Sequence, residues 1–555
     1  MSHLLRGVHI ASKQLAYLLI IISVVSLLLL GSLYWLSHAI EQRQDEIAIW
    51  LSNKVDYPVT LGAASLQQLD FMPKLHIEQL KLLSKNSDTE LLSLGSLYLG
   101  VDIVSSIQHG EPILKDITVK NITASVIKDE SGILSLKGFN FSDNTPSGKK
   151  IDWLNWLQSL NSFNLDSIAI DYTDHQIPVL SGQYKLKSTA LNHDESDWST
   201  IGSLQLPSSL GKTIQFKAQA IIDDSLKNSI WEVTFKTEGA KISSFSQAIE
   251  SQNIAIKQGL ADAILSITGV GNTVNKVVNS LQLSQLKLSP LRTEESADLS
   301  SSLINKLDGE FEWQLINDGW QLQGQKIVID MNGEVWPETD ITVKKVAGEW
   351  LIKSNYLKLS DVSDLALLTA SSPEMIRAQK PAGEIDALMV RLSAKEGLKG
   401  VAFNLKEGAF LPWQEYPGVS GLTVAVNWND GLANIEMNSH KLHLYAEQWL
   451  DKAVFFDSVT GNLRVQHNDK ALALQSEALR IWNDDLTVQL DGNIEHFSSG
   501  NTQTDLQIVL EDMKLNSWKR YIPQKILQKG FQDWANLAFV QGIISDGKIE
   551  LVGDL

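Results

Sequence analysis

The sequence of 555 residues contains no cysteine. Disulfide scaffolds, thiolate zinc sites, iron–sulfur clusters and cysteine nucleophiles are therefore excluded. Basic residues are also scarce, because 47 Lys and Arg stand against 65 Asp and Glu and give a net charge of −18. Nucleic-acid binding needs a basic face, so that class of partner is excluded as well. With 43% hydrophobic and 20% charged residues, the composition is that of a folded protein.

Charged residues are missing altogether between Lys13 and Glu41. This apolar run is long enough to cross a bilayer, which takes about 20 helical residues. Arg6 and Lys13 precede the run, so the positive-inside rule places residues 1–13 in the cytoplasm and the bulk of the chain in the periplasm of a bacterial cell. A cleaved signal peptide is the alternative, since Ser37-His38-Ala39 resembles a cleavage site, but the run exceeds the usual length of about 7–15 residues.

Beyond the apolar run, residues 41–55 have the pattern of a short helix, and then the hydrophobic period changes to two. Apolar residues alternate with polar ones in Leu97–Ile103, Ile117–Val126 and Leu486–Leu490, as expected for strands that bury one face. Strands do not alternate with helices as they do in doubly wound folds. The pattern predicts a mainly β protein with roughly 25–30 strands in an antiparallel sheet.

Glycine followed by an alternating apolar run recurs along the second half of the chain. The intervals of 31–40 residues would fit a structural repeat of two or three strands, although turns in any β protein also use glycine. Helical spacing interrupts the strands at Ile151–Leu160, Phe245–Leu281, Asp364–Ala378 and Leu515–Val540. The recurring glycines are Gly309, Gly348, Gly383, Gly421, Gly461 and Gly492.

Motifs that carry chemistry are not recognisable in the sequence. Gly211-Lys212-Thr213 lacks the first glycine of a phosphate loop, and Gly269-Val270-Gly271 lacks the third glycine of a dinucleotide fingerprint. His440 and His443 would point to opposite faces of a strand, so a metal site there is not expected. The sixteen Trp residues are interpreted as packing residues. No enzyme activity, no metal and no cofactor are therefore expected.

Several segments resemble the YhdP proteins of the AsmA-like family. They are Pro58-Val59 after a short helix, Pro73-Lys74-Leu75 with Ile77, Asn332-Gly333-Glu334-Val335-Trp336-Pro337, and Trp518-Lys519-Arg520-Tyr521-Ile522-Pro523 followed by a helix and Gly542. The tryptophan usual before Pro73 is replaced by Leu69 or Phe71. Relatives are longer, and this chain ends within a strand pattern at Gly547–Leu551, so we interpret it as an N-terminal portion.

The resemblance implies a bridge-like protein whose long, curved antiparallel β-sheet forms a hydrophobic groove for phospholipid moving from the inner to the outer membrane. The expected organisation is a cytoplasmic tail (1–13), a transmembrane anchor (14–40), a first β-rich region (41–240), a helical insertion (241–285), a repeating β-groove (286–514), and a helical break with the start of further strands (515–555).

Acyl chains would suit the uncovered apolar face of many half-buried strands. The alternative is a scaffold for outer-membrane biogenesis or envelope integrity, in which the sheet closes on itself or docks an outer-membrane or periplasmic protein through its edge. The residues expected to line the groove are Val424, Val426, Leu442, Leu444, Leu486, Val488 and Leu490.

Overall fold

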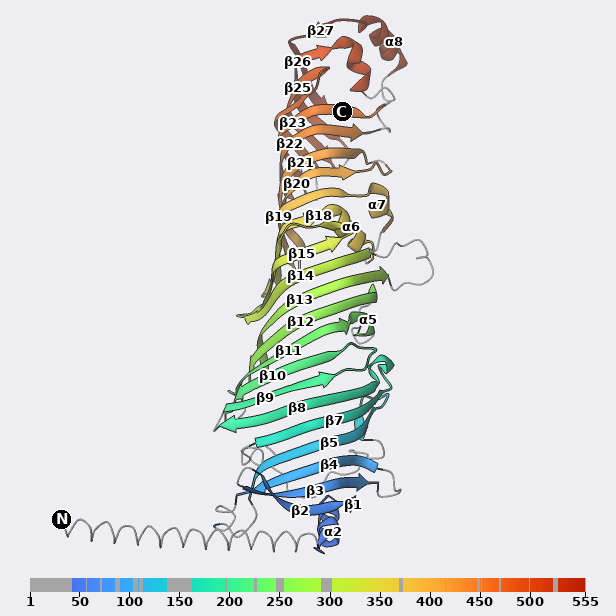
Figure 1. Ribbon diagram of the computed structural model, residues 1–555. Helices are drawn as coiled ribbons and strands as arrows, with labels where there is room; N and C mark the ends of the chain where they lie inside the picture. Colours follow the sequence, from blue (N-terminus) through green and yellow to red (C-terminus); the bar gives the residue numbers. More distant parts are fainter. Residues whose placement is uncertain are drawn as a thin grey trace, which may run out of the picture. The chain divides into compact units, whose positions relative to one another are not determined.

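The computed structural model describes residues 42–554, apart from residues 56, 70–71, 85–89, 103–107, 109–112, 137–161, 195–196, 224–226, 246–253, 291–301, 369–372, 415, 447–449, 451, 469–470, 499 and 523–527. The described residues form 28 strands and a few short helices, which confirms a mainly β protein (Figure 1). No helix in this part of the chain is both long and apolar enough to cross a membrane. The anchor expected over residues 14–40 lies outside the described residues.

The chain divides into two compact units, and the β12 strand (Ile254–Val270) contributes to both. Unit 1 comprises residues 1–249 with 264–273, and unit 2 comprises residues 250–263 with 274–555. The helical elements of unit 1 are α2 (Gln44–Val55), η2 (Pro178–Leu180) and α5 (Ile242–Phe245). Its strands are β1 (Val59–Thr60), β2 (Ala63–Leu69), β3 (Met72–Leu83), β4 (Glu90–Val101), β5 (Leu114–Lys128), β6 (Leu134–Leu136), β7 (Ser162–Asp174), β8 (Gly182–Asp194), β9 (Asp197–Gln205), β10 (Thr213–Ile221) and β11 (Ile230–Lys241).

The sheet of unit 1 is mixed, so the expectation of a purely antiparallel sheet is wrong. β5 and β7 pair in parallel from Asp116 opposite Ser162 to Lys128 opposite Asp174. Parallel neighbours need a connection of a dozen or more residues, and β5 ends at Lys128 whereas β7 begins at Ser162. The strand pairs β3–β4, β4–β5 and β7–β8 through β10–β11 are antiparallel.

A residue with positive φ in β5 accompanies a phase shift in the sequence. Ile117 and Val119 are buried and pack against Leu97 and Leu99 of β4, whereas the next apolar positions are Ile122 and Ala124. Asn121 lies between the two sets with a φ of 55°, a conformation that only a few non-glycine residues adopt. Leu94 pairs with Ile122 and Ser96 with Lys120, so the strand contains no extra residue at Asn121. Ile122 nevertheless packs against the cluster of Ile117 and Val119, although the spacing of the apolar residues changes from even to odd.

Unit 2 contains a run of antiparallel hairpins. Each of its main strands, which are all except the two-residue strands β16 and β27, pairs with the next main strand along the chain. Its helical elements are α6 (Leu359–Ala366), α7 (Pro373–Gln379), η3 (Leu515–Arg520) and α8 (Lys529–Ala538). Its strands are β13 (Thr273–Pro290), β14 (Ser302–Ile316), β15 (Gly319–Met331), β16 (Glu334–Val335), β17 (Thr339–Val346), β18 (Glu349–Lys358), β19 (Ala382–Ser393), β20 (Gly397–Phe410), β21 (Gly418–Asn429), β22 (Leu432–Tyr445), β23 (Val454–His467), β24 (Ala471–Trp482), β25 (Leu486–Phe497), β26 (Thr502–Lys514), β27 (Ile543–Ile544) and β28 (Gly547–Asp554).

The recurring glycines mark a hairpin unit in the second half of this sheet. Gly383, Gly421, Gly461 and Gly492 lie in β19, β21, β23 and β25, the first strands of successive hairpins. Lys441 in β22 has a φ of 56°, and a Cβ on Gly421 would lie 2.7 Å from its carbonyl oxygen. Glycine therefore leaves room for the bulge in the neighbouring strand. Gly309 in β14 likewise lies opposite a register shift in β15, where Lys326 has a φ of 50°, whereas Gly348 lies in the β17–β18 turn.

The helical expectations have mixed outcomes. The helix expected over Phe245–Leu281 is wrong, because β12 and β13 occupy most of this range and α5 is its only described helix. The apolar residues there alternate at period two over long strands, and this pattern outweighs the helical spacing. Asp364–Ala378 falls on the separate helices α6 and α7, and the Leu515–Val540 region contains η3 and α8 as expected. The expected helix Ile151–Leu160 lies outside the described residues.

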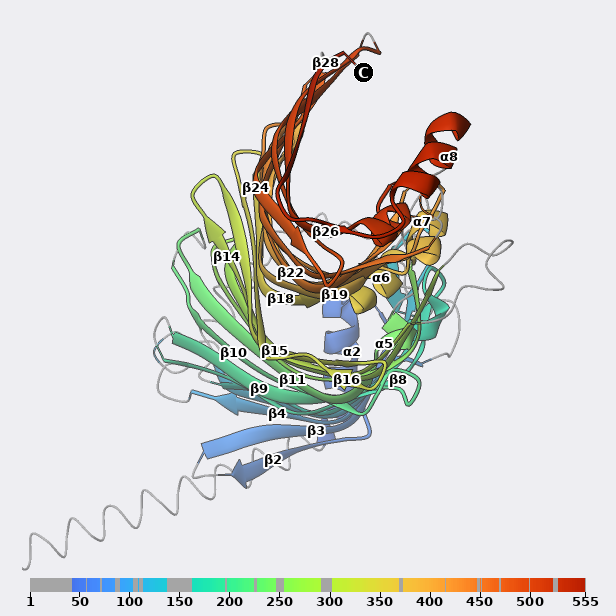
Figure 2. The same ribbon diagram turned by 90° about the horizontal axis from the view of Figure 1, so that it is seen from above.

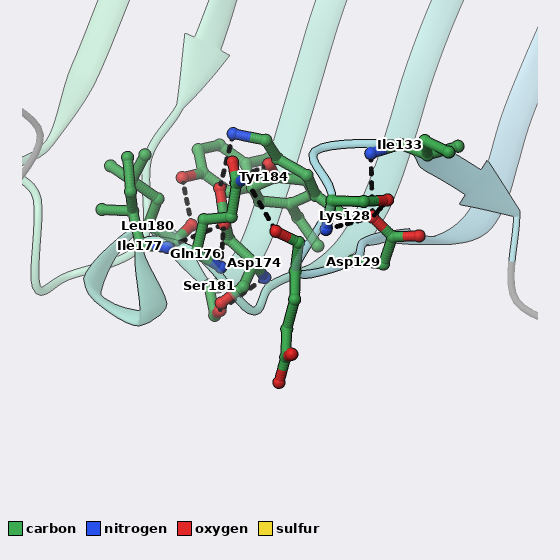
Figure 3. A network of polar contacts seen from close by, with 12 residues as sticks. Lys128, Asp129, Ile133, Asp174, Gln176, Ile177, Leu180, Ser181 and Tyr184 are labelled. Atoms are coloured by element: carbon green, nitrogen blue, oxygen red, sulfur yellow. Dashed lines mark hydrogen bonds and ion pairs between the residues drawn. The ribbon is translucent and has the colours of Figure 1, made fainter.

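A buried carboxylate organises the turn between β7 and β8 (Figure 3). Asp174 is 2% exposed and accepts hydrogen bonds from the backbone N–H groups of Gln176 (2.9 Å) and Ile177 (2.8 Å) and from the Tyr172 hydroxyl (2.8 Å). Burial alone would raise the pKa of Asp174, but these hydrogen bonds and nearby Lys128 outweigh it and hold the pKa below its ordinary value. Burial and the Asp174 carboxylate raise the pKa of Tyr172 to about 12, so its hydroxyl remains a donor.

This network predicts an acid-sensitive contribution to stability. Because the pKa of Asp174 is lowered in the folded state, its stabilisation is present above the unfolded value of 3.8 and is lost as the pH falls through the folded pKa. We expect Asp174→Asn to reduce the free energy of unfolding at pH 7 by about 1–3 kcal/mol, measured by chemical denaturation. The difference from wild type should shrink below pH 4. Asp171→Asn, at an exposed position of the same strand, is the control, and equal effects of the two variants would contradict the role of Asp174.

Candidate functional site

Cross-strand pairing in unit 2 aligns apolar side chains across twelve successive main strands, from β13 to β25. Each residue of this set lies directly opposite the next one in the neighbouring strand, so all of them share one face of the sheet. We call the set the apolar row and the face that carries it the inner face. The apolar row is Val277, Trp313, Leu322, Val343, Ile352, Val390, Val401, Trp428, Ala433, Val465, Leu474 and Ile494.

The adjoining row of paired residues is mostly polar. Because neighbouring residues of a strand point to opposite faces, this polar row marks the outer face. Only three of its twelve members are apolar, against all twelve members of the apolar row. The polar row is Val278, Glu312, Gln323, Thr342, Lys353, Met389, Ala402, Asn427, Asn434, Arg464, Gln475 and Asn493.

The apolar row is not covered as a protein core would be. Of its twelve side chains only Ala433 is buried, and Leu474 is 38% exposed. Residues of central strands in a closed sandwich or barrel would be buried by a second layer. An extended apolar line that retains exposure is instead typical of a binding surface.

Unit 1 has an apolar row of its own. Seven successive strands, β3, β4, β5, β7, β8, β9 and β10, each place a leucine or isoleucine opposite the next. None of the seven side chains is fully buried. The parallel pair β5–β7 lies within this row, so the change of strand direction does not interrupt it. The residues are Leu80, Leu94, Ile122, Ile168, Leu186, Leu204 and Ile214.

Two of the residues predicted to line the groove lie beside the apolar row of unit 2. Val424 pairs with Leu405 and Met437, and Val426 pairs with Phe403 and Ile435. These two valines alternate along β21 with Trp428, a member of the apolar row. Leu490 likewise pairs with Leu479 and Ile508.

The other predicted residues are buried or packed against different segments of the chain. Leu486 and Val488 form a cluster with Met513, with Trp518 of η3 and with Ala535 of α8. Leu444 packs against a second cluster of Ala446, Leu450 and Val454, and Leu442 is 6% exposed opposite Phe456. Thr487, expected to face away from Val488, is also buried because the pairing shifts between these two residues. The chain itself therefore covers part of the inner face.

The Trp518–Tyr521 motif holds the covering segment on the inner face of the sheet. Trp518 is 1% exposed within the cluster, while Arg520 forms an ion pair with Asp485 at the β24–β25 turn. The Tyr521 hydroxyl accepts a hydrogen bond from Asn483 Nδ2 at 3.0 Å. One face of the segment thus packs on the sheet, and its polar side chains bind the turn. In Figure 2, α8 lies on the concave side of the curved strands of unit 2.

The segment from Asn332 to Pro337, which also resembles a family motif, has a similar structural role. The Trp336 indole N–H donates to Asp361 Oδ2 at 2.7 Å, and both residues are buried. Asn332 Nδ2 lies 3.4 Å from Asp361 Oδ1, so the β15–β16 turn is bonded to α6. Trp336 also packs edge to face on Tyr356, with ring centroids 5.8 Å apart. The motif closes the β15–β16 turn, and it also holds α6 against the sheet.

Catalytic or metal-binding arrangements do not emerge from the described residues. Nowhere among them are three or more His, Asp or Glu side chains grouped to hold a metal ion. His443 lies in an aromatic contact with Phe455, with ring centroids 4.8 Å apart. His440 is exposed on the same strand.

A continuous and incompletely covered apolar row in each of the two units defines a class of protein that presents an extended apolar surface. The family comparison agrees with the motifs. The family model described as YhdP protein matches residues 1–555, and the chain belongs to this family. No curated protein and no solved structure matches the chain.

The difference between covered and uncovered positions predicts different tolerance to charge. Val488 is 9% exposed beneath Trp518, so Val488→Asp should lower the free energy of unfolding by about 3 kcal/mol or more. Leu474→Asp should cost about 1 kcal/mol or less, because a carboxylate at this position remains hydrated. Chemical denaturation of both variants tests this expectation. Equal destabilisation would mean that the apolar row is covered like a core.

Proposed function

We propose that the chain provides a hydrophobic groove for phospholipid, with acyl chains lying along the apolar rows and headgroups in water. The observation that supports this function most directly is the run of twelve paired apolar residues that remain incompletely covered. Membership of the YhdP family is consistent with it. The direction we propose is from the inner to the outer membrane.

The groove would bind lipid by the hydrophobic effect, at about 0.8 kcal/mol per buried CH₂. Successive strands offer the acyl chain similar surroundings about 4.8 Å apart, so movement from one strand to the next replaces one apolar contact with another. The free energy changes little along such a path, and movement requires no reacting group. We accordingly propose a transport role without catalysis, metal or cofactor.

We further propose that residues 14–40 anchor the chain in the inner membrane, with the N-terminus in the cytoplasm and the β units in the periplasm. This topology is supported by the absence of charged residues from that run and by the basic residues before it. Phospholipid is then the principal partner. A periplasmic or outer-membrane protein is a further possible partner, and nucleic acid is not one.

Photo-crosslinking at adjacent residues tests the assignment of faces. We expect benzoylphenylalanine at Leu322 or Leu474, both in the apolar row, to give phospholipid adducts detected by mass spectrometry. The matched positions Gln323 and Gln475 are the next residues in the same strands and lie in the polar row, so they should give few adducts. Equal labelling within each pair would contradict a lipid-binding inner face.

A charge in the apolar row tests for a continuous path. Leu474→Asp should reduce phospholipid movement between the two membranes at least tenfold, measured by pulse-chase labelling, because acyl chains would have to pass an ionised carboxylate. The control is Leu537→Asp, at an 81% exposed position of α8. Normal movement in cells that accumulate the Leu474→Asp protein would contradict a conduit and favour the scaffold alternative.

A further inference from the structure

The outer face of unit 2 contains a hollow of about 500 Å³ lined in part by polar side chains, a volume within the usual range for ligand sites of about 300–1,000 Å³. Its lining residues come from β19 to β24. On each of the strands β20 to β23, the lining includes two outer-face residues and the residue between them, so side chains form the walls and backbone forms the floor. The outer-face residues are Ala387, Ala402, Asn404, Ala425, Asn427, Asn434, Glu436, Asn462, Arg464 and Glu477.

Four asparagines gather in this hollow, one from each of four neighbouring strands. Asparagine is depleted in strands, because its side chain competes with the backbone for hydrogen bonds and packs poorly on a sheet. Asn404, Asn427 and Asn462 lie within strands, and their side-chain amides have no hydrogen-bond partner among the described residues. Each of these amides offers two N–H donors and one carbonyl acceptor. Ala402 and Ala425 beside them are small enough to leave space above the floor.

The remaining polar groups determine the charge of the hollow. Arg464 donates from Nε to Asn434 Oδ1 at 3.3 Å and from Nη1 to Gln475 Oε1 at 3.2 Å, and its Nη1 lies 3.9 Å from Glu477. With Glu436, the lining carries two carboxylates and one guanidinium, a formal charge of −2 + 1 = −1. An anionic ligand would be repelled, so phosphate-bearing headgroups do not fit this site.

We propose that the hollow binds a neutral saccharide. Hydroxyl groups both donate and accept, and they match the paired donors and acceptors of side-chain amides and carboxylates. The hollow crosses β19 to β24, which is about 24 Å at ~4.8 Å per strand, so it accommodates an oligosaccharide lying across the strands. The site faces away from the apolar row, and its ligand would be held without obstructing the inner face.

A titration with a neutral oligosaccharide tests this site. The full chain, purified in a detergent without a sugar headgroup, is titrated with the β-1,4-linked tetramer of N-acetylglucosamine and followed by calorimetry. We expect saturable binding that weakens at least tenfold in Asn427→Ala and in Asn462→Ala. The control Asn493→Ala changes the same residue type on the outer face of β25, outside the hollow, and should leave the affinity unchanged.

The outcomes separate this site from the lipid groove. No saturable binding of the tetramer, or equal weakening in Asn493→Ala, would overturn the proposal. Tighter binding of inorganic phosphate or of anionic vesicles through the same asparagines would also overturn it. Lipid adducts at Leu474 should persist in Asn427→Ala and Asn462→Ala, so loss of saccharide binding and loss of lipid binding are distinguishable.

Discussion

Backbone hydrogen bonds between neighbouring strands set the cross-strand register, and the rest of the structure depends on that register. A strand alternates its side chains at a period of two, so a slip of one residue would move an entire apolar set to the opposite face. In unit 2 the apolar row keeps its pairing across twelve successive main strands, while the adjacent row remains mostly polar. No single strand determines which face is apolar. A continuous apolar row arises only because the register places each apolar residue beside another one in the next strand.

Residues with positive φ preserve the faces where a strand changes phase. Asn121 in β5 and Lys441 in β22 adopt this conformation, and the apolar positions before and after them differ by an odd number of residues. With regular alternation throughout, one half of each strand would direct its apolar residues into water. Gly421 and Gly461 then leave room where a bulge in the next strand brings a carbonyl oxygen close. The same glycines that give the sequence its approximate period therefore allow the strands to bend.

Local patterns predicted much of the fold, and long-range contacts account for the remainder. Alternation correctly gave the strand content, and spacing around Pro523 correctly gave the helical segment after β26. The parallel pairing of β5 with β7 joins segments that are far apart in the sequence, and no local pattern records it. For the candidate site, alternation placed Val424 and Val426 on the same face as Trp428, but it could not separate the buried Val424 and Val488 from the exposed Leu474. Val488 and Leu474 are both apolar and lie in strands with alternating sequences. Their exposure differs because Trp518 and Ala535 pack on Val488.

The two proposed ligands, phospholipid on the inner face of unit 2 and a saccharide on its outer face, would place opposite demands on affinity. Movement along the inner face requires that no strand bind an acyl chain much more tightly than its neighbours, which favours a row of similar aliphatic and aromatic side chains without polar groups. A fixed ligand on the outer face requires the reverse, a few directional groups concentrated at one place, as Asn404, Asn427 and Asn462 are. Alternation lets one strand meet both demands, since Val426 and Asn427 are neighbours in sequence and lie on opposite faces. A site with polar groups can therefore be confined to the outer face of β19 to β24 while the apolar row behind it remains continuous.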